Sequence, residues 1–219
     1  YGFHYYVYGV IRNFGHSGLL KNLFGDSSFI TGLLRFIGWD LSGRIVQTGS
    51  NFGVSQRCDV PQLTRIGTGT MVADGLTVLN SDYSATAFRV DETRIGANNY
   101  LGNVIAYPSG GRTGDNVLLG TKVLVPIDGP VRENTGLLGS PSFEIPRLVK
   151  RDTEFDDLKD GEEHDRRLAG KNRSNLVTMG LYLLGAVFQT FAGFFVFAWV
   201  LADPPLDVPV RLAGATIVV

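Results

Sequence analysis

An apolar residue recurs every six positions through the middle of this chain. It falls at 66, 72 and 78, and after an interruption again at 95, 101, 107, 113, 119 and 125, usually followed by Gly or another small residue. Such a period fits short strands of about six residues, three of which complete one triangular coil with the first residue pointing inward. The sequence therefore predicts a mainly β fold, a parallel β-helix of hexapeptide repeats.

Two kinds of departure from the period are informative. Tyr107 is large for a coil interior and Thr113 is polar, so we expect this coil to be distorted or locally open. The step from 78 to 95 is 17 rather than 6, so 11 extra residues leave the prism as a loop at 79–94. Loops on a rigid solenoid are where binding chemistry tends to lie.

The segments around the repeat complete the predicted organisation. Residues 1–35 are a lead-in rich in aromatic residues and Gly, which suits either a membrane–water interface or an ordinary packed helix. The β-helix domain covers 36–146, with 127–146 capping its open end. Residues 147–175 form a charged linker, and 203–219 begin a further segment. We interpret the chain as an internal piece of a longer membrane protein, because it lacks an initiator Met and stops in a second apolar stretch.

Residues 176–202 hold 27 uncharged residues rich in Leu, Phe and Val. About 20 suffice to cross the ~30 Å hydrocarbon layer, which predicts a transmembrane α-helix. A buried core helix is the alternative, but such a run exceeds what a small domain can cover. Basic residues precede the span and acidic residues follow it, which predicts that the β-helix lies on the cytoplasmic face of the membrane. They are Arg166, Arg167, Lys171 and Arg173 before it, and Asp203 and Asp207 after it.

Charge and cysteine content exclude several classes. The formal net charge is −1, which provides no field for attracting nucleic acid. Cys58 is the single cysteine, so the chain has no internal disulfide and no cysteine metal cluster. We expect no metal site.

Several stretches in and after the repeat point to one family. They include Ile66-Gly-Thr-Gly-Thr70, Asn80-Ser-Asp-Tyr-Ser84, Gly111-Arg-Thr-Gly-Asp115, Lys122-Val-Leu-Val-Pro-Ile-Asp-Gly129, Leu138-Gly-Ser-Pro141 and Phe143-Glu-Ile-Pro146. Over roughly 30–205 the chain resembles the membrane-embedded C-terminal region of poly-ε-lysine-synthetase-like (Pls/PosA type) non-ribosomal peptide synthetases. The hexapeptide part alone is shared with the hexapeptide-repeat acyltransferase superfamily.

The resemblance implies several properties that the period alone does not. The β-helix would be left-handed, and adenylation and carrier domains would precede it in the same longer chain as its partners, beside the membrane. The module would act on, or position, an aminoacyl or peptidyl thioester on a phosphopantetheine arm.

Acyl transfer to an amine or hydroxyl needs a base near the nucleophile, most often His, and donors for the oxyanion. The histidines lie outside the repeat, at His4, His16 and His164. Within the loop 79–94, Asp82 is the candidate base, with Asn80 or Tyr83 orienting the substrate. The alternative is that Asp82 and Asn80 cap a turn through side-chain to backbone hydrogen bonds.

A second candidate site is the stretch Ser109-Gly-Gly-Arg112. It lacks the Gly-Lys-Ser/Thr ending of a phosphate-binding loop. Gly110, Gly111 and Arg112 remain candidates for binding the phosphates of a phosphopantetheine arm or of acyl-CoA, since Arg forms bidentate bonds to phosphate. The alternative is an ordinary surface turn.

Three functional hypotheses follow. The first is a membrane-tethered, acyltransferase-like module of a peptide synthetase that joins aminoacyl thioesters to amines. The second is a non-catalytic scaffold that orders membrane spans and docks the carrier domain. The third is a stand-alone, membrane-bound acetyltransferase, which the missing loop histidine disfavours.

Overall fold

The structure is a computed structural model that describes residues 2–15, 17–25, 27–41, 46–47, 52–147 and 161–201. It divides into two compact units, Tyr1–Asn172 and Arg173–Val219. The first unit contains the β-helix and the helices before it. The second contains the apolar part of one long helix.

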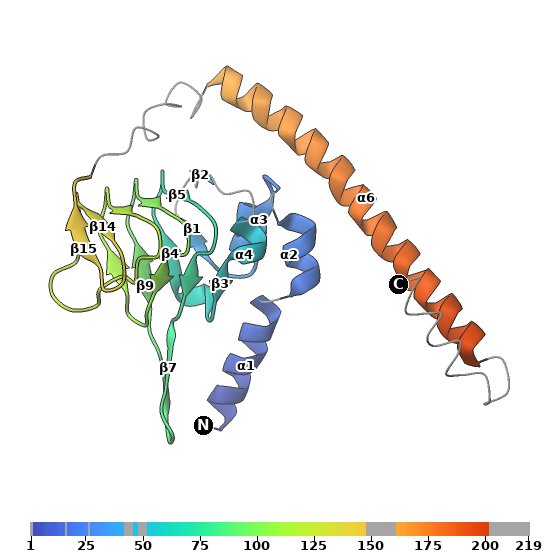
Figure 1. The fold of residues 1–219 in the computed structure, drawn as a ribbon, viewed down its shortest axis with the longest axis horizontal. Helices are drawn as coiled ribbons and strands as arrows, with labels where there is room; N and C mark the ends of the chain where they lie inside the picture. The colour runs from blue at the N-terminus through green and yellow to red at the C-terminus, as the bar shows by residue number, and fades with distance from the viewer. Residues whose placement is uncertain are drawn as a thin grey trace. The chain divides into compact units, whose positions relative to one another are not determined.

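Three parallel sheets form the sides of a prism (Figure 1). Each coil contributes one short strand to sheet A, then one to sheet B, then one to sheet C. Sheet A contains β1 (Asp40–Leu41), β4 (Thr64–Ile66), β9 (Thr93–Ile95) and β12 (Arg112–Thr113). Sheet B contains β2 (Val46–Gln47), β5 (Met71–Val72), β10 (Tyr100–Leu101), β13 (Leu118–Leu119), β14 (Gly136–Leu138) and the antiparallel β15 (Phe143–Ile145). Sheet C contains β3 (Arg57–Cys58), β6 (Thr77–Val78) and β11 (Ala106–Tyr107).

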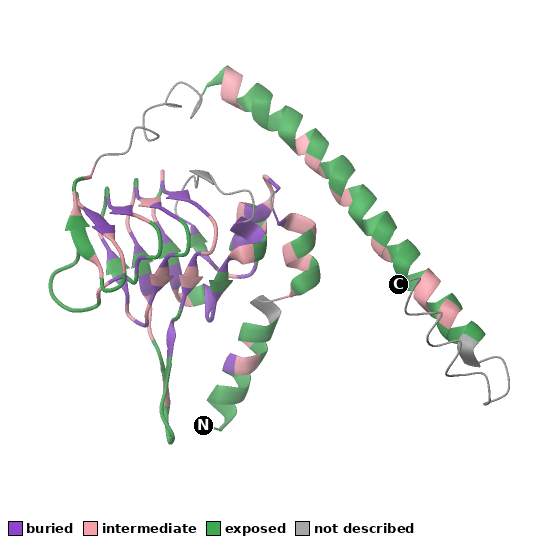
Figure 2. Cartoon of the chain, viewed as in Figure 1, coloured by how far each residue is buried: buried purple, intermediate pink, exposed green. Residues whose placement is uncertain are grey.

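The strand register confirms the six-residue period. Ile66 pairs with Ile95 in sheet A, and Leu101 pairs with Leu119 in sheet B. Buried residues are concentrated in the prism (Figure 2). All nine repeat residues have exposed fractions of 4 % or less; they are Ile66, Val72, Val78, Ile95, Leu101, Tyr107, Thr113, Leu119 and Val125. The prediction of a parallel β-helix is therefore confirmed, while its left-handed winding stays an expectation from the resemblance.

The expected distortion at Tyr107 and Thr113 is absent from this coil. Both residues are buried, and the Tyr107 hydroxyl lies 2.9 Å from Thr113 Oγ1. Gly111 makes room for the ring, because a Cβ at that residue would lie only 3.3 Å from Tyr107 Cδ1. The expectation of an open coil was wrong because the Tyr107 hydroxyl and the Thr113 hydroxyl form a buried hydrogen bond with each other.

Close packing explains the glycines at one corner of the prism. A Cβ on Gly67 would lie 2.5 Å from the Ala97 nitrogen, and one on Gly96 would lie 2.3 Å from the Gly114 oxygen. Successive coils therefore stack backbone on backbone at this corner, where any side chain would clash.

Helices cover the N-terminal end of the prism. They are α1 (Phe3–Gly15), α2 (Gly18–Phe24), α3 (Ile30–Phe36) and α4 (Phe52–Ser55), with the 3-10 turn η1 at Pro61–Leu63. Ile30 and Leu34 of α3 and Phe52 of α4 belong to the same buried cluster as the repeat residues. The apolar interior thus continues from the prism into α3 and α4.

The loop 79–94 forms an antiparallel hairpin of β7 (Ser81–Tyr83) and β8 (Phe88–Val90). It projects outward from the prism as a two-stranded ribbon (Figure 1). The extra residues therefore build an arm beside the prism instead of a cover over it.

The last described element is α6 (Glu162–Leu201), a helix of 40 residues. It includes the predicted span up to Leu201 and begins in the charged segment that we expected to be a linker. By length and composition this helix is long and apolar enough to cross a membrane, and none of its most apolar 18-residue stretch is buried (Figure 2). Residues 148–160 and 202–219, which hold the rest of that linker and the predicted final segment, lie outside the described residues.

Candidate functional site

Asn80, a predicted substrate-orienting residue, is buried at the point where the chain leaves sheet C for the hairpin. Its Oδ1 accepts a hydrogen bond from the Val60 backbone N–H at 2.9 Å. Its Nδ2 donates to the Leu63 carbonyl oxygen at 3.3 Å and to Thr64 Oγ1 at 3.1 Å. The amide therefore joins the hairpin root to the chain around η1 and faces the interior of the protein.

Asp82, the predicted base, lies on β7 of the hairpin, directly after Ser81. Its side chain is 53 % exposed, and its Oδ2 accepts a hydrogen bond from Arg89 Nη2 at 3.1 Å. Asp82 and Arg89 are also direct cross-strand partners in the β7–β8 ladder. This ion pair stabilises the ribbon but leaves the carboxylate in solvent.

Arg89 links the hairpin to the predicted phosphate-binding turn. Its Nε lies 2.9 Å from Asp91 Oδ2, and the same carboxylate oxygen accepts a hydrogen bond from Ser109 Oγ at 3.4 Å. A chain of polar contacts thus runs from Asp82 through Arg89 and Asp91 to Ser109. It brings the two predicted sites together at the hairpin root.

The turn at 109–112 is closed by its own backbone. The Gly111 N–H donates to the Pro108 carbonyl oxygen at 2.8 Å, and the Gly111 oxygen accepts from the Arg94 N–H at 3.2 Å. Gly110 has φ +72°, a left-handed conformation that favours glycine. The Gly111 backbone N–H and oxygen are therefore already hydrogen-bonded within the turn and sheet A. Of the three predicted phosphate-binding residues, Arg112 has an exposed side chain that could contact a ligand.

Arg112 belongs to a vertical row that sequence reasoning missed. In sheet A, Arg65 pairs with Arg94, and Arg94 pairs with Arg112, so the three side chains point outward from neighbouring strands. Strands in a sheet lie about 4.8 Å apart, which places like charges next to one another. We call Arg65, Arg94 and Arg112 the arginine ladder.

Two members of the ladder have acidic partners from this chain. Arg65 Nε lies 2.6 Å from Asp40 Oδ2, and Arg94 Nη2 lies 2.7 Å from Glu92 Oε2. The hydrogen bond from Arg94 lowers the pKa of Glu92 most, and the charges of Arg65 and Arg112 add to this effect. Within the part of the chain that the structure describes, the Arg112 side chain forms no hydrogen bond or ion pair.

The spacing of these arginines is a signal in the sequence. Arg94 and Arg112 are 18 residues apart, which is three repeats, and Arg65 is 29 residues before Arg94, which is 18 plus the 11 of the hairpin insertion. Counting one full coil at a time would have placed all three on one face.

A second polar cluster joins α1 to the hairpin root. Ser81 Oγ donates to Asp59 Oδ2 at 2.6 Å, and the Tyr8 hydroxyl lies 3.0 Å from Ser81 Oγ and contacts the Tyr83 hydroxyl. Arg12 Nε lies 3.4 Å from Asp59 Oδ1. Burial raises the pKa of Tyr8 to about 12, so its hydroxyl is neutral at physiological pH. The cluster fastens α1 to the prism.

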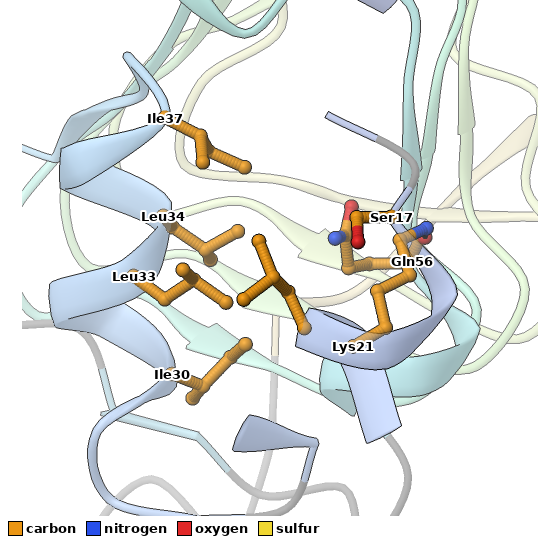
Figure 3. A pocket seen from close by; sticks show the side chains of 8 residues that line it. Ser17, Lys21, Ile30, Leu33, Leu34, Ile37 and Gln56 are labelled. Atoms are coloured by element: carbon orange, nitrogen blue, oxygen red, sulfur yellow. Dashed lines mark hydrogen bonds between the residues drawn. The ribbon is translucent and has the colours of Figure 1, made fainter. Parts of the chain in front are cut away.

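The small cavity between α2 and α3 is too small for a substrate. Its volume is about 10 Å³, which is room for roughly one water molecule. Ile30, Leu33 and Leu34 of α3 and Ile37 directly after it line one side, and Lys21 lies on the other (Figure 3). Lys21 Nζ donates to the Gln56 carbonyl oxygen at 2.8 Å, and burial lowers the pKa of Lys21.

No described residue supplies the missing loop histidine. His4 is exposed on α1, and His164 Nδ1 lies 2.8 Å from Asp165 Oδ1 on α6. His16 lies outside the described residues. The described residues also contain no group of His, Cys, Asp and Glu that could hold a metal ion.

Comparison with known proteins gives a likeness of fold. No family model and no curated protein matches this chain. Among solved structures, it is similar to a maltose O-acetyltransferase from Clostridium difficile 630, with a TM-score of 0.46 and 18 % identity over 66 % of this chain and 89 % of that one. It is also similar to a hexapeptide-repeat acetyltransferase from Vibrio cholerae, with a TM-score of 0.47 and 15 % identity over 65 % and 93 % of the two chains.

A third similar structure is a galactoside acetyltransferase in complex with coenzyme A, with a TM-score of 0.44 and 14 % identity over 66 % and 84 % of the two chains. Each of the three similarities covers about two thirds of this chain. The strand register of this chain establishes the prism fold independently of them.

Proposed function

We propose that this chain is a membrane-tethered β-helix module that docks a phosphate-bearing acyl carrier and leaves the chemical step to another part of a longer protein. The arginine ladder carries this proposal. Like charges directly opposite each other on neighbouring strands are destabilising, so three arginines in register favour an anionic ligand. Asp40 and Glu92 offset two of the charges, and no described residue pairs with the exposed Arg112 side chain.

A phosphodiester fits this arrangement. A guanidinium group donates two parallel hydrogen bonds to a phosphate, and Arg112 presents such a group on the outer face of sheet A. The phosphopantetheine arm of a carrier domain, or the phosphates of acyl-CoA, would supply such a group. The fold places the ladder on short, paired strands, so the docking surface is rigid before the ligand arrives.

The placement of the predicted catalytic residues supports docking over catalysis. The Asn80 amide is satisfied in the interior, and the Asp82 carboxylate is paired with Arg89 on an outward-projecting ribbon. A general base must lie within hydrogen-bond reach of the proton that it removes. Asp82 would meet this requirement only if a partner placed the nucleophile against the hairpin.

The resemblance to poly-ε-lysine-synthetase-like proteins suggests the wider context of the proposal. In that context adenylation and carrier domains precede this piece, α6 anchors it in the membrane, and the prism lies on the cytoplasmic face. The second candidate is the acyltransferase-like module of the same assembly, with Asp82 as base. It shares the docking site and differs in what Asp82 does.

Binding to the ladder is tested with Arg112→Ala in the full-length protein reconstituted in lipid nanodiscs. Coenzyme A and a phosphopantetheinylated carrier domain are the probes, and isothermal titration calorimetry measures the affinity. A charge-assisted contact contributes about 1.5–3 kcal/mol, so the Kd should rise roughly tenfold or more. Arg57→Ala is the matched control, because Arg57 is an exposed arginine on β3 of sheet C. An equal effect of both substitutions, or no effect of either, would overturn the docking proposal.

Catalysis is tested separately with Asp82→Asn. Docking alone predicts unchanged turnover in a reconstituted synthetase, because another residue supplies the base. The catalytic candidate predicts a fall in turnover of about 10²–10⁴-fold, the usual contribution of a positioned base. Arg112→Ala should raise KM and leave kcat nearly unchanged, as loss of uniform binding does.

A further inference from the structure

The N-terminal helix and the hairpin form one uncharged projection. Residues 3–11 of α1 and residues 83–88 at the hairpin tip contain no Asp, Glu, Lys or Arg, and aromatic side chains are dense in both. In Figure 1 both segments extend from the same side of the prism. We call these two segments together the aromatic wedge.

Aromatic contacts hold the two parts of the wedge together. The Tyr5 and Phe88 rings meet edge to face with centroids 5.3 Å apart, and the Tyr8 and Phe88 centroids are 5.7 Å apart. Tyr8 is only 6 % exposed, and its hydroxyl reaches the buried Ser81 at the hairpin root. The wedge is therefore a packed unit, and one face of α1 is fully used in building it.

The opposite face of α1 is also apolar, and it is exposed. Phe3 is 77 % exposed, Tyr6 70 % and Val10 54 %, and Val7 adjoins them. These positions follow the i, i+3, i+4, i+7 pattern of one helical stripe. Within the described residues nothing covers this stripe, although such stripes ordinarily pack against a core.

Charged residues begin at the base of the wedge. The Arg12–Asp59 pair lies on the prism side of α1, and the Asp82–Arg89 pair lies on the hairpin just before the tip. An apolar, aromatic end above a belt of charges is the arrangement of segments that rest in a membrane interface. The basic residues within 1–25 are Arg12 and Lys21, and this stretch has no acidic residue to be repelled by anionic headgroups.

From this pattern we infer that the aromatic wedge inserts into the headgroup region of a lipid bilayer, as a membrane contact separate from α6. The chain carries its own helix that is long and apolar enough to cross a bilayer, which makes a lipid surface the partner that fits this stripe. The wedge would fix the orientation of the prism on the membrane, which a single helix on a linker does not. This inference does not depend on carrier docking, because the wedge contains no member of the arginine ladder.

Site-specific labelling tests the inference in the full chain, reconstituted in vesicles of phosphatidylcholine and phosphatidylglycerol. Tyr6→Cys and Thr86→Cys carry an environment-sensitive fluorophore on the helix stripe and the hairpin tip. Val131→Cys, which is 54 % exposed on a loop of the prism, is the control position. The native Cys58 is buried and does not compete for the label.

Spin-labelled lipids should quench the fluorophore at 6 and at 86 from a shallow depth, and should leave the fluorophore at 131 unquenched. Introducing Phe3→Glu together with Tyr6→Glu should abolish quenching at 86, while circular dichroism shows an intact prism. Phe36→Glu is the matched control, since Phe36 is an exposed aromatic residue outside the wedge, at 78 %. If 6 and 86 are shielded from aqueous quenchers but not quenched by lipid, the wedge binds protein and the inference fails. Full aqueous access at both positions overturns it as well.

Discussion

The Tyr107 hydroxyl lies 2.9 Å from Thr113 Oγ1 inside the prism, with both side chains buried. Tyr107 comes from sheet C and Thr113 from the next strand of the chain, in sheet A. Burial raises the pKa of Tyr107, so the hydroxyl stays protonated and can donate the bond. The two residues that depart from the apolar repeat therefore form a hydrogen bond with each other.

This pairing predicts strong coupling between the two positions. Tyr107→Phe and Thr113→Val should each destabilise the fold by about 1–3 kcal/mol, because each leaves a buried polar group without its partner. The double variant should be closer to the wild type than the sum of the single effects. Urea unfolding followed by circular dichroism measures all four proteins, and additive effects would show that the bond contributes nothing specific.

The prism interior should not tolerate a carboxylate. Leu101 is 0 % exposed, so Leu101→Asp should destabilise the fold by several kcal/mol and unfold the prism. Leu124→Asp is the matched control, because Leu124 is 43 % exposed on the outside and should lose little stability. Circular dichroism and thermal unfolding distinguish the two, and a folded Leu101→Asp protein would contradict the inward register.

Val104 has a left-handed backbone conformation, which is unfavourable for valine. Its φ is +60°, whereas Asn98 and Asn116 fill comparable left-handed turns. A left-handed conformation costs an ordinary L-residue roughly 1–2 kcal/mol, and a short polar side chain reduces that cost. Val104→Asn should therefore raise stability by about 1 kcal/mol in urea unfolding. Val131→Asn, an exposed valine without a positive φ, should show no such gain.

Alkaline pH should destabilise the fold through Cys58. Burial is the main cause that raises the pKa of this thiol from 9.0 to about 12. The folded state thus holds the proton more tightly than the unfolded chain, so stability is full below pH 9 and falls as the pH rises toward 12. Between pH 9 and 10 the raised pKa values of Tyr8 and Tyr107 contribute little, because both start from 10.0. The lowered pKa of Lys21 acts in the opposite direction, so the Cys58 contribution is the difference between the slopes of the wild type and Cys58→Ala.

Denaturant titrations from pH 7 to about 10 measure this slope. Cys58→Ala should flatten it, at some cost in stability at neutral pH from the lost packing. In the wild type, thiol reagents should react slowly at neutral pH and faster once urea opens the prism. A fast reaction of the folded protein would contradict the burial of Cys58.

The orientation of α6 remains a prediction from charge. Arg173→Cys before the apolar run and Asp203→Cys after it should be labelled from opposite sides of the membrane, with position 173 reached from the cytoplasm. Impermeant maleimides applied to intact cells and to inverted vesicles make the measurement. Labelling of position 173 from outside would show the opposite orientation, and labelling at positions throughout the apolar run would show that α6 does not cross the membrane.

The sequence predicted the prism well because its signal is local and repeated. Each coil places one residue in six on the inside at fixed intervals, so Ile66, Leu101 and Leu119 are identified without knowledge of the fold. The hairpin insertion was found by the same counting. The arginine ladder was missed, because its members are neighbours only after three repeats and an 11-residue insertion are counted together.

The candidate site depended on contacts that no local pattern encodes. Asn80 and Asp82 are two residues apart in the same motif, yet one is buried and the other is 53 % exposed. The partners that decide this difference, Val60 for Asn80 and Arg89 for Asp82, come from elsewhere in the chain. Residue type alone could not distinguish a base from a structural hydrogen-bond partner.

The amino-acid sequence by itself determined the six-residue coil, the inward-facing residues, the hairpin insertion and the apolar run of α6, because hydrophobic burial is periodic in strands and continuous in a long apolar helix. Only the tertiary structure decided that Tyr107 and Thr113 satisfy each other, that Arg112 stands at the end of a row of arginines, and that α1 packs against the hairpin. These outcomes depend on distances between residues far apart in the chain, which stacking of the coils sets and local propensity does not.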